Sequence, residues 1–375
     1  MSLVQHRYWV RRRSAPGGTI LHAILLAGGR GRRLRPLSDV RPKPLVPVAN
    51  RPLIERQLLA LAAAGVREAR LAIGRDQESF LRQSLADGRA LGLRLRYAVE
   101  AAPLGSGGAV AAALVSGPVF NPVLVCNADI VSRFDPAAML HAHRAAGAEV
   151  SIALSEVDDP SRFGVVSLDD DGRISRFAEK PAAGAVASRP GGAYWANAGY
   201  WLIDPQRLAG IDPTRFSRLE ETLFPAMAAA GEPIFGLPLP DVGGGDLWLD
   251  VGTPAAYREA NRRLLEGIGL RIGAGASVDA TARIEGDVQL GPGVVVGAEA
   301  RLSGPIAIGR DCRIGPGAIL RDCVLWERVR IGAGARLRGC VVTDEARIAP
   351  GERLRQTIRT SAGPDTSLGE SRSAR

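Results

Sequence analysis

The sequence predicts an α/β domain with a doubly wound, mostly parallel sheet, followed by a smaller solenoid of short strands. Up to about residue 267, apolar runs alternate with alanine- and leucine-rich segments of helical character. Strands that helices bury on both faces give this pattern. From residue 272 onward, an aliphatic residue instead returns at nearly every sixth position, and such periodicity indicates a repeat architecture.

The α/β domain is expected over residues 19–267, and its elements follow from its apolar runs. Strands are expected at 23–26, 69–73, 93–98, 123–126, 150–154 and 198–203. Helices are expected at 53–64, 77–85, 107–116 and 137–146. Ligands of such sheets bind at the carboxyl ends of the strands. The glycine-rich stretch that directly follows the first strand is therefore a candidate binding site.

The solenoid is expected over residues 271–358. Fifteen aliphatic residues from Ile272 to Leu354 follow the six-residue period, with two five-residue steps, and glycine often comes next. The pattern resembles the left-handed parallel β-helix of hexapeptide repeats, in which the aliphatic side chain points inward. Cys323 and Cys340 share one phase of the repeat, so they should stack roughly 4.8 Å apart on successive coils. That spacing permits a disulfide, but we expect buried free thiols.

Composition narrows the class of protein. The length of 375 residues suits two domains, and the net charge of +9 suits anionic ligands, although a solvated arginine-rich surface would give the same charge. The sequence lacks the stripe of aromatic and basic residues that is typical of nucleic-acid binding, so no nucleic-acid partner is expected. No apolar run approaches the roughly 18 residues of a membrane span. The four cysteines lack the CxxC spacing of zinc and redox sites.

The two ends of the chain are expected to be disordered, over residues 1–18 and 359–375. The basic start has no apolar core leading to a cleavage site, so no secretory signal is expected. A cytoplasmic protein with reduced thiols follows. The solenoid contains no histidine that could serve as the base of an acyltransferase. We therefore interpret it as a structural part that supports a homo-oligomer or regulation.

Two neighbouring segments carry the strongest indication of chemistry: GGRGRRLRPL at 28–37 and RPKPLVPV at 41–48. They do not form the dinucleotide fingerprint GxGxxG, because Leu34 occupies its third glycine position, and they lack the P-loop GxxxxGK[ST]. Backbone amides without side chains can face phosphate oxygens, and a nearby guanidinium can grip two of them. We interpret the stretch as a polyanion-binding turn.

These segments resemble the signature of the sugar nucleotidyltransferases, GGxGTRLxPLT followed by PKPLxPV. Arg32 and Ser38 replace the two usual threonines. Further segments agree in order: PLGSGGAV at 103–110, CNADI at 126–130, RFGVV at 162–166, FAEKP at 177–181, NAGYW at 197–201 and WLDVGTP at 248–254. The resemblance thus covers the whole catalytic region, and a β-helix after it also suits the family.

The resemblance implies attack of a sugar 1-phosphate on the α-phosphorus of a nucleoside triphosphate, with release of pyrophosphate. The second pKa of a phosphomonoester is about 6, so the nucleophile is ionised at neutral pH and needs no general base. The protein must align two polyanions and spread the developing charge. Cations, backbone amides and acids that hold Mg²⁺ meet this need.

The resemblance also implies roles for individual residues. Those expected at the reacting centre are Arg33, Lys43, Asp129 and Asp250, with the two aspartates as Mg²⁺ ligands. Those expected to bind the nucleotide are Leu26, Ala27, Gly28, Gly29, Gly31, Arg33, Lys43, Glu100, Leu104, Gly105, Gly107 and Asp129. Those expected to bind the sugar phosphate are Gly164, Glu179, Lys180 and Asn197. Because side chains of adjacent extended residues point to opposite faces, Glu179 and Lys180 could share one ligand only across a bend.

The combination of motifs is most similar to mannose-1-phosphate guanylyltransferases, which implies GTP and mannose 1-phosphate as substrates. The alternatives are thymidylyl, uridylyl or adenylyl transfer to glucose 1-phosphate, and guanylyl transfer to a heptose 1-phosphate. A non-catalytic subunit that senses NDP-sugars is a further alternative, although Arg33, Lys43, Asp129 and Asp250 are all present.

Overall fold

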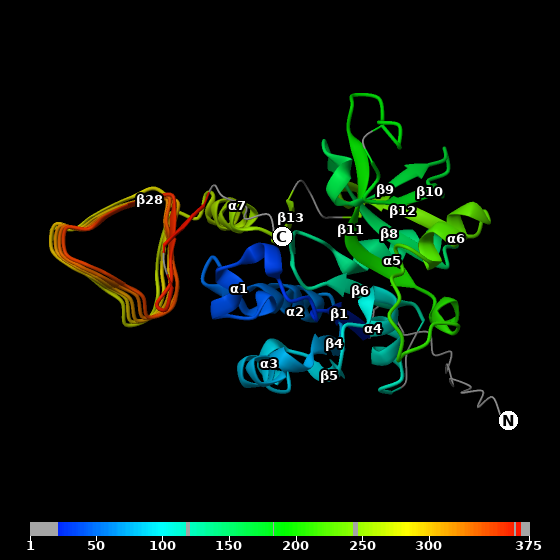
Figure 1. Ribbon diagram of the computed structural model, residues 1–375, viewed down its shortest axis with the longest axis horizontal. Coiled ribbons are helices and arrows are strands. Elements are labelled where there is room, and N and C mark those ends of the chain that lie inside the picture. The colour runs from blue at the N-terminus through cyan, green and yellow to red at the C-terminus, as the bar shows by residue number, and fades with distance from the viewer. Residues whose placement is uncertain (1–21, 118–120, 183, 243–246, 364, 369–375) are drawn as a thin grey trace. The chain divides into compact units, whose positions relative to one another are not determined.

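The computed structural model describes residues 22–117, 121–182, 184–242, 247–363 and 365–368 (Figure 1). The expected disordered start, residues 1–18, lies outside this part of the chain. The chain forms two units that differ from the expected domains. One contains the residues up to Gly29 together with Ile54–Trp248, and the other contains Arg30–Leu53 together with Leu249–Arg375. Residues 30–48 of the signature thus belong to the same unit as the repeat, whereas Gly28 and Gly29 belong to the first unit.

The first unit contains a mixed nine-stranded sheet, whose main path runs β10-β9-β11-β6-β1-β4-β5. Its core is parallel: β1 pairs in parallel with β4 and β6, and β4 with β5. Strand β11 runs antiparallel to β6, β8 and β9. The strands are β1 (His22–Leu26), β4 (Glu68–Gly74), β5 (Arg94–Glu100), β6 (Val123–Asn127), β8 (Val150–Val157), β9 (Gly164–Leu168), β10 (Ile174–Glu179), β11 (Tyr194–Ile203) and β12 (Ile234–Pro238).

Helices accompany this sheet, as the alternating pattern predicts. They are α2 (Leu53–Ala63), α3 (Glu78–Leu85), α4 (Gly105–Leu114), α5 (Pro136–Ala145) and α6 (Leu223–Ala229). The six expected strands and four expected helices are confirmed, with ends that differ by a few residues. Strands β9 and β10 were not expected, because RFGVV and FAEKP each offer only a short apolar run beside charged residues.

The second unit opens with the signature segment. Its elements are short: η2 (Arg32–Leu34), α1 (Leu37–Val40), η3 (Lys43–Leu45), β2 (Pro47–Val48) and β3 (Arg51–Pro52). Later in the chain follow β13 (Trp248–Asp250) and helix α7 (Pro254–Leu265). Helix α7 holds the segment through two hydrogen bonds. The Tyr257 hydroxyl donates to the Pro47 carbonyl at 2.6 Å, and the Ala49 N–H donates to Asn261 Oδ1 at 2.8 Å.

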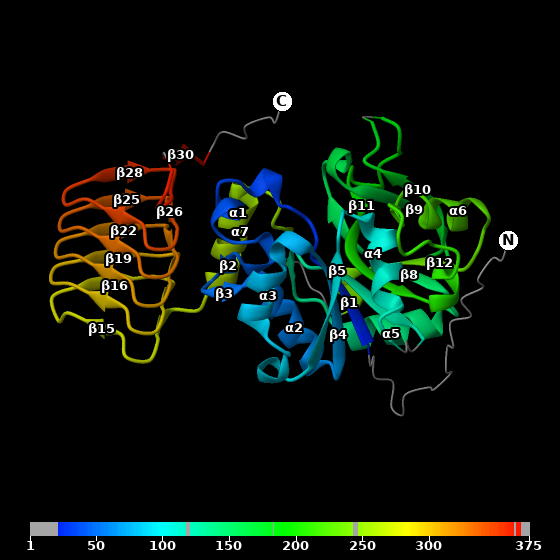
Figure 2. The same cartoon turned by 60° about the horizontal axis from the view of Figure 1, so that its bottom comes forward.

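The repeat forms a parallel β-helix, seen along its axis in Figure 1 and from the side in Figure 2. Its first sheet contains β14 (Leu270–Ile272), β17 (Val288–Leu290), β20 (Ile306–Ile308), β23 (Val324–Leu325), β26 (Val341–Val342) and β29 (Thr357–Arg359). The second contains β15 (Ser277–Val278), β18 (Val295–Val296), β21 (Arg313–Ile314), β24 (Arg330–Ile331) and β27 (Arg347–Ile348). The third contains β16 (Arg283–Glu285), β19 (Arg301–Ser303), β22 (Ile319–Arg321), β25 (Arg336–Arg338) and β28 (Arg353–Arg355).

The six-residue period correctly predicts the buried side chains of the inner coils, whereas Ile272 in the first coil is 54% exposed. Leu302, Leu320 and Leu337, for example, pair in register on successive coils and are 1%, 0% and 2% exposed. Cys323 and Cys340 directly precede the paired residues Val324 and Val341, and both are buried free thiols, as expected.

The structure corrects the boundary of the C-terminal tail. Residues 359–375 were expected to be disordered, but β30 (Thr366–Ser367) pairs antiparallel with β29. Arg359 also forms an ion pair with Glu352 at 2.6 Å. The described residues 365–368 therefore close the end of the β-helix.

Candidate active site

The glycine turn after β1 meets a buried carboxylate. A methyl group at Gly28 would come within 3.2 Å of Glu100 Oε1, a tight contact that glycine avoids. Glu100, at the end of β5, accepts a hydrogen bond from the Leu104 N–H at 3.0 Å. Burial raises the pKa of Glu100, and the Leu104 hydrogen bond opposes the shift. Three residues predicted to bind the nucleotide, Gly28, Glu100 and Leu104, are thus neighbours.

Asp129 lies in the tight turn between β6 and β7 (Ile130–Ser132). Three hydrogen bonds fix this turn. The Ala128 N–H donates to the Leu26 carbonyl at 3.1 Å, and Gln57 Nε2 donates to the carbonyls of Asn127 and Ile130 at 2.8 and 2.9 Å. The half-buried Asp129 therefore sits beyond the carboxyl end of a central parallel strand, next to the end of β1.

Arg33, Lys43 and Asp250 come together in the second unit, although more than 200 residues separate the lysine from the aspartate. Lys43 Nζ lies 3.8 Å from Asp250 Oδ1, and an Arg33 guanidinium nitrogen lies 3.9 Å from Oδ2. The Lys43 side chain is 10% exposed and that of Arg33 is 63% exposed. A buried cation and an exposed one thus share a single carboxylate.

Gly31 determines how Lys43 is packed. Its φ of +61° is in the left-handed region, and a methyl group there would meet Lys43 Cβ at 3.0 Å and Ser38 Cβ at 3.2 Å. The Ser38 hydroxyl donates to the Gly31 carbonyl at 2.8 Å. Ser38, a departure from the usual threonine, therefore keeps a hydroxyl at the base of the turn.

The residues predicted to bind the sugar phosphate gather at the edge of the first unit's sheet. Gly164 and Glu179 are paired between β9 and β10, and a methyl group at Gly164 would come within 2.8 Å of Glu179 Oε2. Lys180 has a φ of +44°, and its Nζ lies 2.7 Å from Glu179 Oε1. The expected bend is thus present at Lys180, and it brings both charged groups to one place.

Asn197 follows the last pair between β9 and β11, where Val165 is opposite Ala196. Its Oδ1 accepts hydrogen bonds from the Gly199 N–H at 2.9 Å and from Trp201 Nε1 at 2.8 Å. These contacts orient the amide, and no described residue bonds to its Nδ2. The strand register therefore carries Asn197 next to Gly164.

Gly105 and Gly107 have a packing role that the sequence did not reveal. Methyl groups there would come within 2.4 Å of the Ser217 carbonyl oxygen and 2.9 Å of Ser217 Oγ. The Gly107 N–H donates to that carbonyl at 2.9 Å. Nearby, the Ser106 hydroxyl donates to Glu220, whose pKa is raised by burial. No familiar motif includes Ser217 or Glu220, so pattern reasoning missed them.

Lys43 and Lys180 are the only lysines of the chain, whereas arginine supplies every other basic side chain. An ammonium is a compact point charge with freely rotating donors, whereas a guanidinium is a wide planar fork. The two positions that retain lysine coincide with the two predicted phosphate contacts.

The donor chemistry at the site fits a divalent cation. Among the described residues no group of three or more His, Cys, Asp or Glu side chains could hold a metal. Magnesium is usually bound through one or two carboxylates and completed by substrate phosphates and water. Asp250, already between two cations, and Asp129, at a strand end, are carboxylates of this kind.

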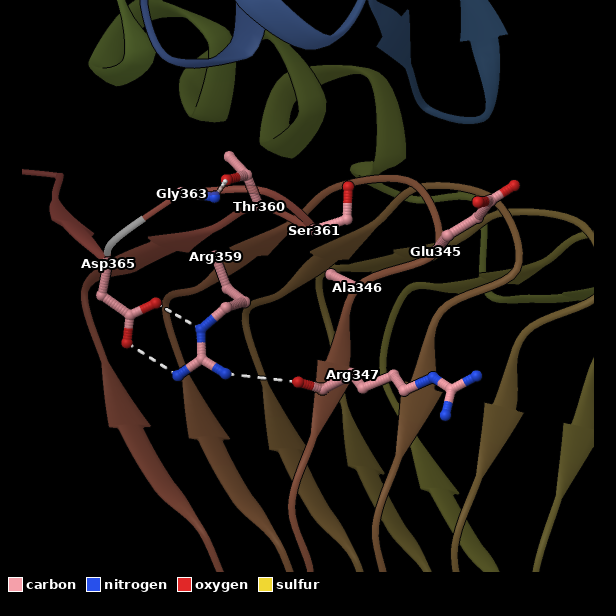
Figure 3. Close-up of a pocket in the computed structure, with 8 residues that line it drawn as sticks. All are labelled: Glu345, Ala346, Arg347, Arg359, Thr360, Ser361, Gly363 and Asp365. Atoms are coloured by element: carbon pink, nitrogen blue, oxygen red, sulfur yellow. Dashed lines mark hydrogen bonds and ion pairs between the residues drawn. The ribbon is translucent and has the colours of Figure 1, made fainter.

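A large cavity at the end of the β-helix is separate from these groups. It measures about 560 Å³ and is lined by Glu345, Ala346, Arg347, Arg359, Thr360, Ser361, Gly363 and Asp365 (Figure 3). None of the predicted site residues lines it. Its Arg359 is already bound to Asp365 at 2.7 Å and to the Arg347 carbonyl at 3.2 Å.

Within the described residues, no helix has the length and apolar character that a membrane crossing requires.

The parallel sheet, the glycine turn and the paired cations around Asp250 define a protein of the nucleotidyltransferase class. The family model described as "Nucleotidyl transferase" matches residues 22–267, and the chain belongs to this family.

The chain is similar to proteins named as mannose-1-phosphate guanylyltransferases. It is 37% identical over 255 residues to "Probable mannose-1-phosphate guanylyltransferase 2" of Arabidopsis thaliana, a match covering 66% of each chain. It is 34% identical over 272 residues to "Probable mannose-1-phosphate guanylyltransferase 1" of Oryza sativa subsp. japonica, covering 72% of this chain and 71% of the relative. It is 35% identical over 240 residues to "Mannose-1-phosphate guanylyltransferase catalytic subunit beta" of Danio rerio, covering 63% and 62%. The chain thus spans about two thirds of the length of these relatives.

Proposed function

We propose that this protein transfers GMP from GTP to mannose 1-phosphate, giving GDP-mannose and pyrophosphate. The observation that carries the proposal is the cluster of Lys43, Arg33 and Asp250, with cation–carboxylate distances of 3.8 and 3.9 Å. Family membership and the names of the relatives support it.

In this mechanism the protein aligns and neutralises two polyanions. The Gly28–Gly29 turn offers its backbone to the triphosphate, Lys43 contacts phosphate at the reacting centre, and Arg33 neutralises charge on the leaving pyrophosphate. Glu179 binds sugar hydroxyls and Lys180 binds the sugar phosphate. The sugar phosphate is itself the nucleophile, because it is ionised at neutral pH.

We propose Asp129 and Asp250 as ligands of Mg²⁺. The bound ion would neutralise phosphate charge and organise the oxygens for in-line displacement. We also propose that the protein works in the cytoplasm, supported by its four buried free thiols, and that it forms a homo-oligomer through the β-helix.

Release of pyrophosphate tests the proposal. Purified protein with Mg²⁺ would receive GTP, ATP, UTP or dTTP, each crossed with mannose 1-phosphate, glucose 1-phosphate and a heptose 1-phosphate. We expect the highest kcat/KM with GTP and mannose 1-phosphate. Preference for another pair would keep the reaction class and replace the substrates. Tight binding of GDP-mannose without turnover of any pair would instead indicate a sensor.

Substitutions test the site. Asp250→Asn should lower kcat by at least about 100-fold, in line with losses at groups that stabilise developing charge. Lys43→Arg keeps the charge but not the shape, and should lower kcat by roughly tenfold or more. Arg89→Lys, at an exposed residue of the first unit that begins the 3-10 helix η5 (Arg89–Leu91), is the matched control and should leave kcat unchanged.

A further inference from the structure

Arg41 lies two residues before Lys43 and makes contacts that are far away in the sequence. Its guanidinium donates to both oxygens of Asp344, at 2.7 and 2.8 Å, although 303 residues separate the two. The same guanidinium lies 3.2 Å from Glu327 Oε1 and 5.6 Å from the centre of the Trp326 ring. All these partners belong to the β-helix.

The two carboxylates are arranged for this contact. Asp344 and Glu327 occupy corners of successive coils, because the Glu345 N–H donates to the Glu327 carbonyl one coil below. Asp344 Oδ1 also accepts from the Glu327 N–H at 3.0 Å. The contact with the neighbouring coil therefore orients Asp344 without any help from Arg41. The two hydrogen bonds from Arg41 to the Asp344 carboxylate hold the guanidinium in one orientation.

Other contacts hold the same segment beyond Lys43. Trp326 is buried, and its Nε1 donates to the Tyr257 hydroxyl at 2.9 Å, which in turn donates to the Pro47 carbonyl. Asn50 Nδ2 donates to the Ile308 carbonyl of β20 at 2.8 Å. Lys43 thus lies between two anchored stretches of chain. Arg41, before it, contacts the β-helix, and residues 47–50, after it, contact the β-helix and α7. The prolines on either side of Lys43 transmit this restraint, because they limit the backbone.

We propose that Asp344 and Glu327 of the β-helix are positioning residues for the transfer reaction, which act through Arg41 to hold Lys43 beside Asp250. The inference rests on the proposed function for the role of Lys43. It makes the β-helix part of the catalytic apparatus, because misplacing a phosphate-binding cation by about 1 Å can cost roughly 100-fold in rate.

The two lysines of the chain allow a direct test. A small amine-acylating reagent would modify the full-length protein briefly, and mass spectrometry would give the ratio of modification at Lys43 to that at Lys180. Lys180 is 54% exposed in its side chain and lies in the other unit, so it is an internal reference. In the Asp344→Asn variant, we expect this ratio to rise several-fold and kcat to fall by between about 10- and 100-fold. The KM for GTP should change less.

The matched control is Glu345→Gln, which removes the adjacent carboxylate that pairs with Arg328 instead of Arg41. It should leave the ratio and kcat at wild-type values. Glu327→Gln should show a smaller effect than Asp344→Asn, which gives a second reading if Asp344→Asn folds poorly. Adding Asp344→Asn to Arg41→Gln should cause little further loss, because Arg41→Gln already removes the contact that Asp344 makes to this segment.

The outcomes are distinct. An Asp344→Asn protein with an unchanged labelling ratio, or with a raised ratio and wild-type kcat, would overturn the inference. If the wild-type protein shows no turnover, the proposed function fails, and the labelling ratio alone then decides whether the β-helix places Lys43.

Discussion

At the scale of single residues, three glycines of the site lie where an added methyl group would crowd a charged side chain. Gly28 faces Glu100, Gly31 faces Lys43, and Gly164 faces Glu179. In each pair a glycine allows a charged side chain to come close to the backbone. The glycines of the signature thus seat charged residues close to the backbone, and under the proposed function they also free backbone amides for the triphosphate.

Gly31→Ala should displace Lys43, because the new methyl group would lie 3.0 Å from Lys43 Cβ. We expect kcat to fall by roughly 10- to 100-fold, measured by pyrophosphate release. Gly147→Ala is the control for backbone strain. Gly147 has the same φ of +61°, but a methyl group added there would contact no neighbouring residue within 4 Å. Both variants should lose about 1 kcal/mol of stability from the left-handed conformation. Equal kcat values in the two variants would contradict the packing role of Gly31.

His143 should make stability sensitive to acid. It is 5% exposed, its Nδ1 lies 2.8 Å from Ser151 Oγ, and burial lowers its pKa from 6.5 to about 4. Between those values the unfolded chain binds a proton that the folded chain does not. The folded state therefore loses stability as pH falls from 6.5 toward 4, and the loss levels off below that range.

From pH 7.5 to pH 5 the loss from His143 should be about 2 kcal/mol. Urea unfolding of His143→Asn should show a shallower decline over this interval than the wild type, even though the variant is less stable at pH 7.5. Parallel declines would show that another group causes the acid sensitivity.

At the scale of elements, local periodicity predicted what local geometry determines. The six-residue period places an aliphatic residue at the inward position of successive strands. The stacked aliphatic side chains, such as Leu302, Leu320 and Leu337, could therefore be predicted directly from the sequence. Buried parallel strands such as β1 and β4 were equally clear. In contrast, β9 and β10 are short, partly exposed strands, and only pairing with each other and with β11 makes them strands. The sequence allowed a bend at Lys180 to be expected, but the ion pair between Lys180 and Glu179 could not be predicted from it.

Truncating an inward leucine should destabilise the protein more in the middle of the β-helix than in its last coil. Leu320 is fully buried between Leu302 and Leu337, whereas Leu354 in the last coil is only partly buried. Leu320→Ala should therefore cost about 2–5 kcal/mol of unfolding free energy, and Leu354→Ala clearly less. Urea unfolding would measure both. Equal costs would mean that coils do not depend on the neighbours above and below them.

At the scale of the whole molecule, the functional boundary does not follow the sequence motifs. The family model ends at residue 267, and the repeat begins soon after. Yet the signature residues 30–53 form one unit with α7 and the β-helix. Contacts such as Arg41–Asp344 join residues 303 positions apart. One sequence carries no periodic trace of such a pair, so the proposed dependence of the site on the repeat could not be predicted from it.

This dependence predicts the behaviour of a shortened chain. A protein ending at Ile268 would lack Asp344, Trp326 and the Ile308 carbonyl, so residues 41–50 would lose these contacts to the β-helix and keep those to α7 and to Asp250. We expect faster trypsin cleavage after Arg32 and Arg33, and a kcat at least about tenfold lower than that of the full chain.

A chain ending at Leu368 is the control, because it keeps every described coil and should match the full-length protein in both assays. Trypsin resistance at Arg33 together with full turnover in the shorter chain would mean that residues 22–267 fold and work alone. The β-helix would then be an independent module, and the contacts of Arg41 would serve stability only. Because helix α7 retains Tyr257 and Asn261 in both proteins, any difference between them reports the contribution of the coils themselves.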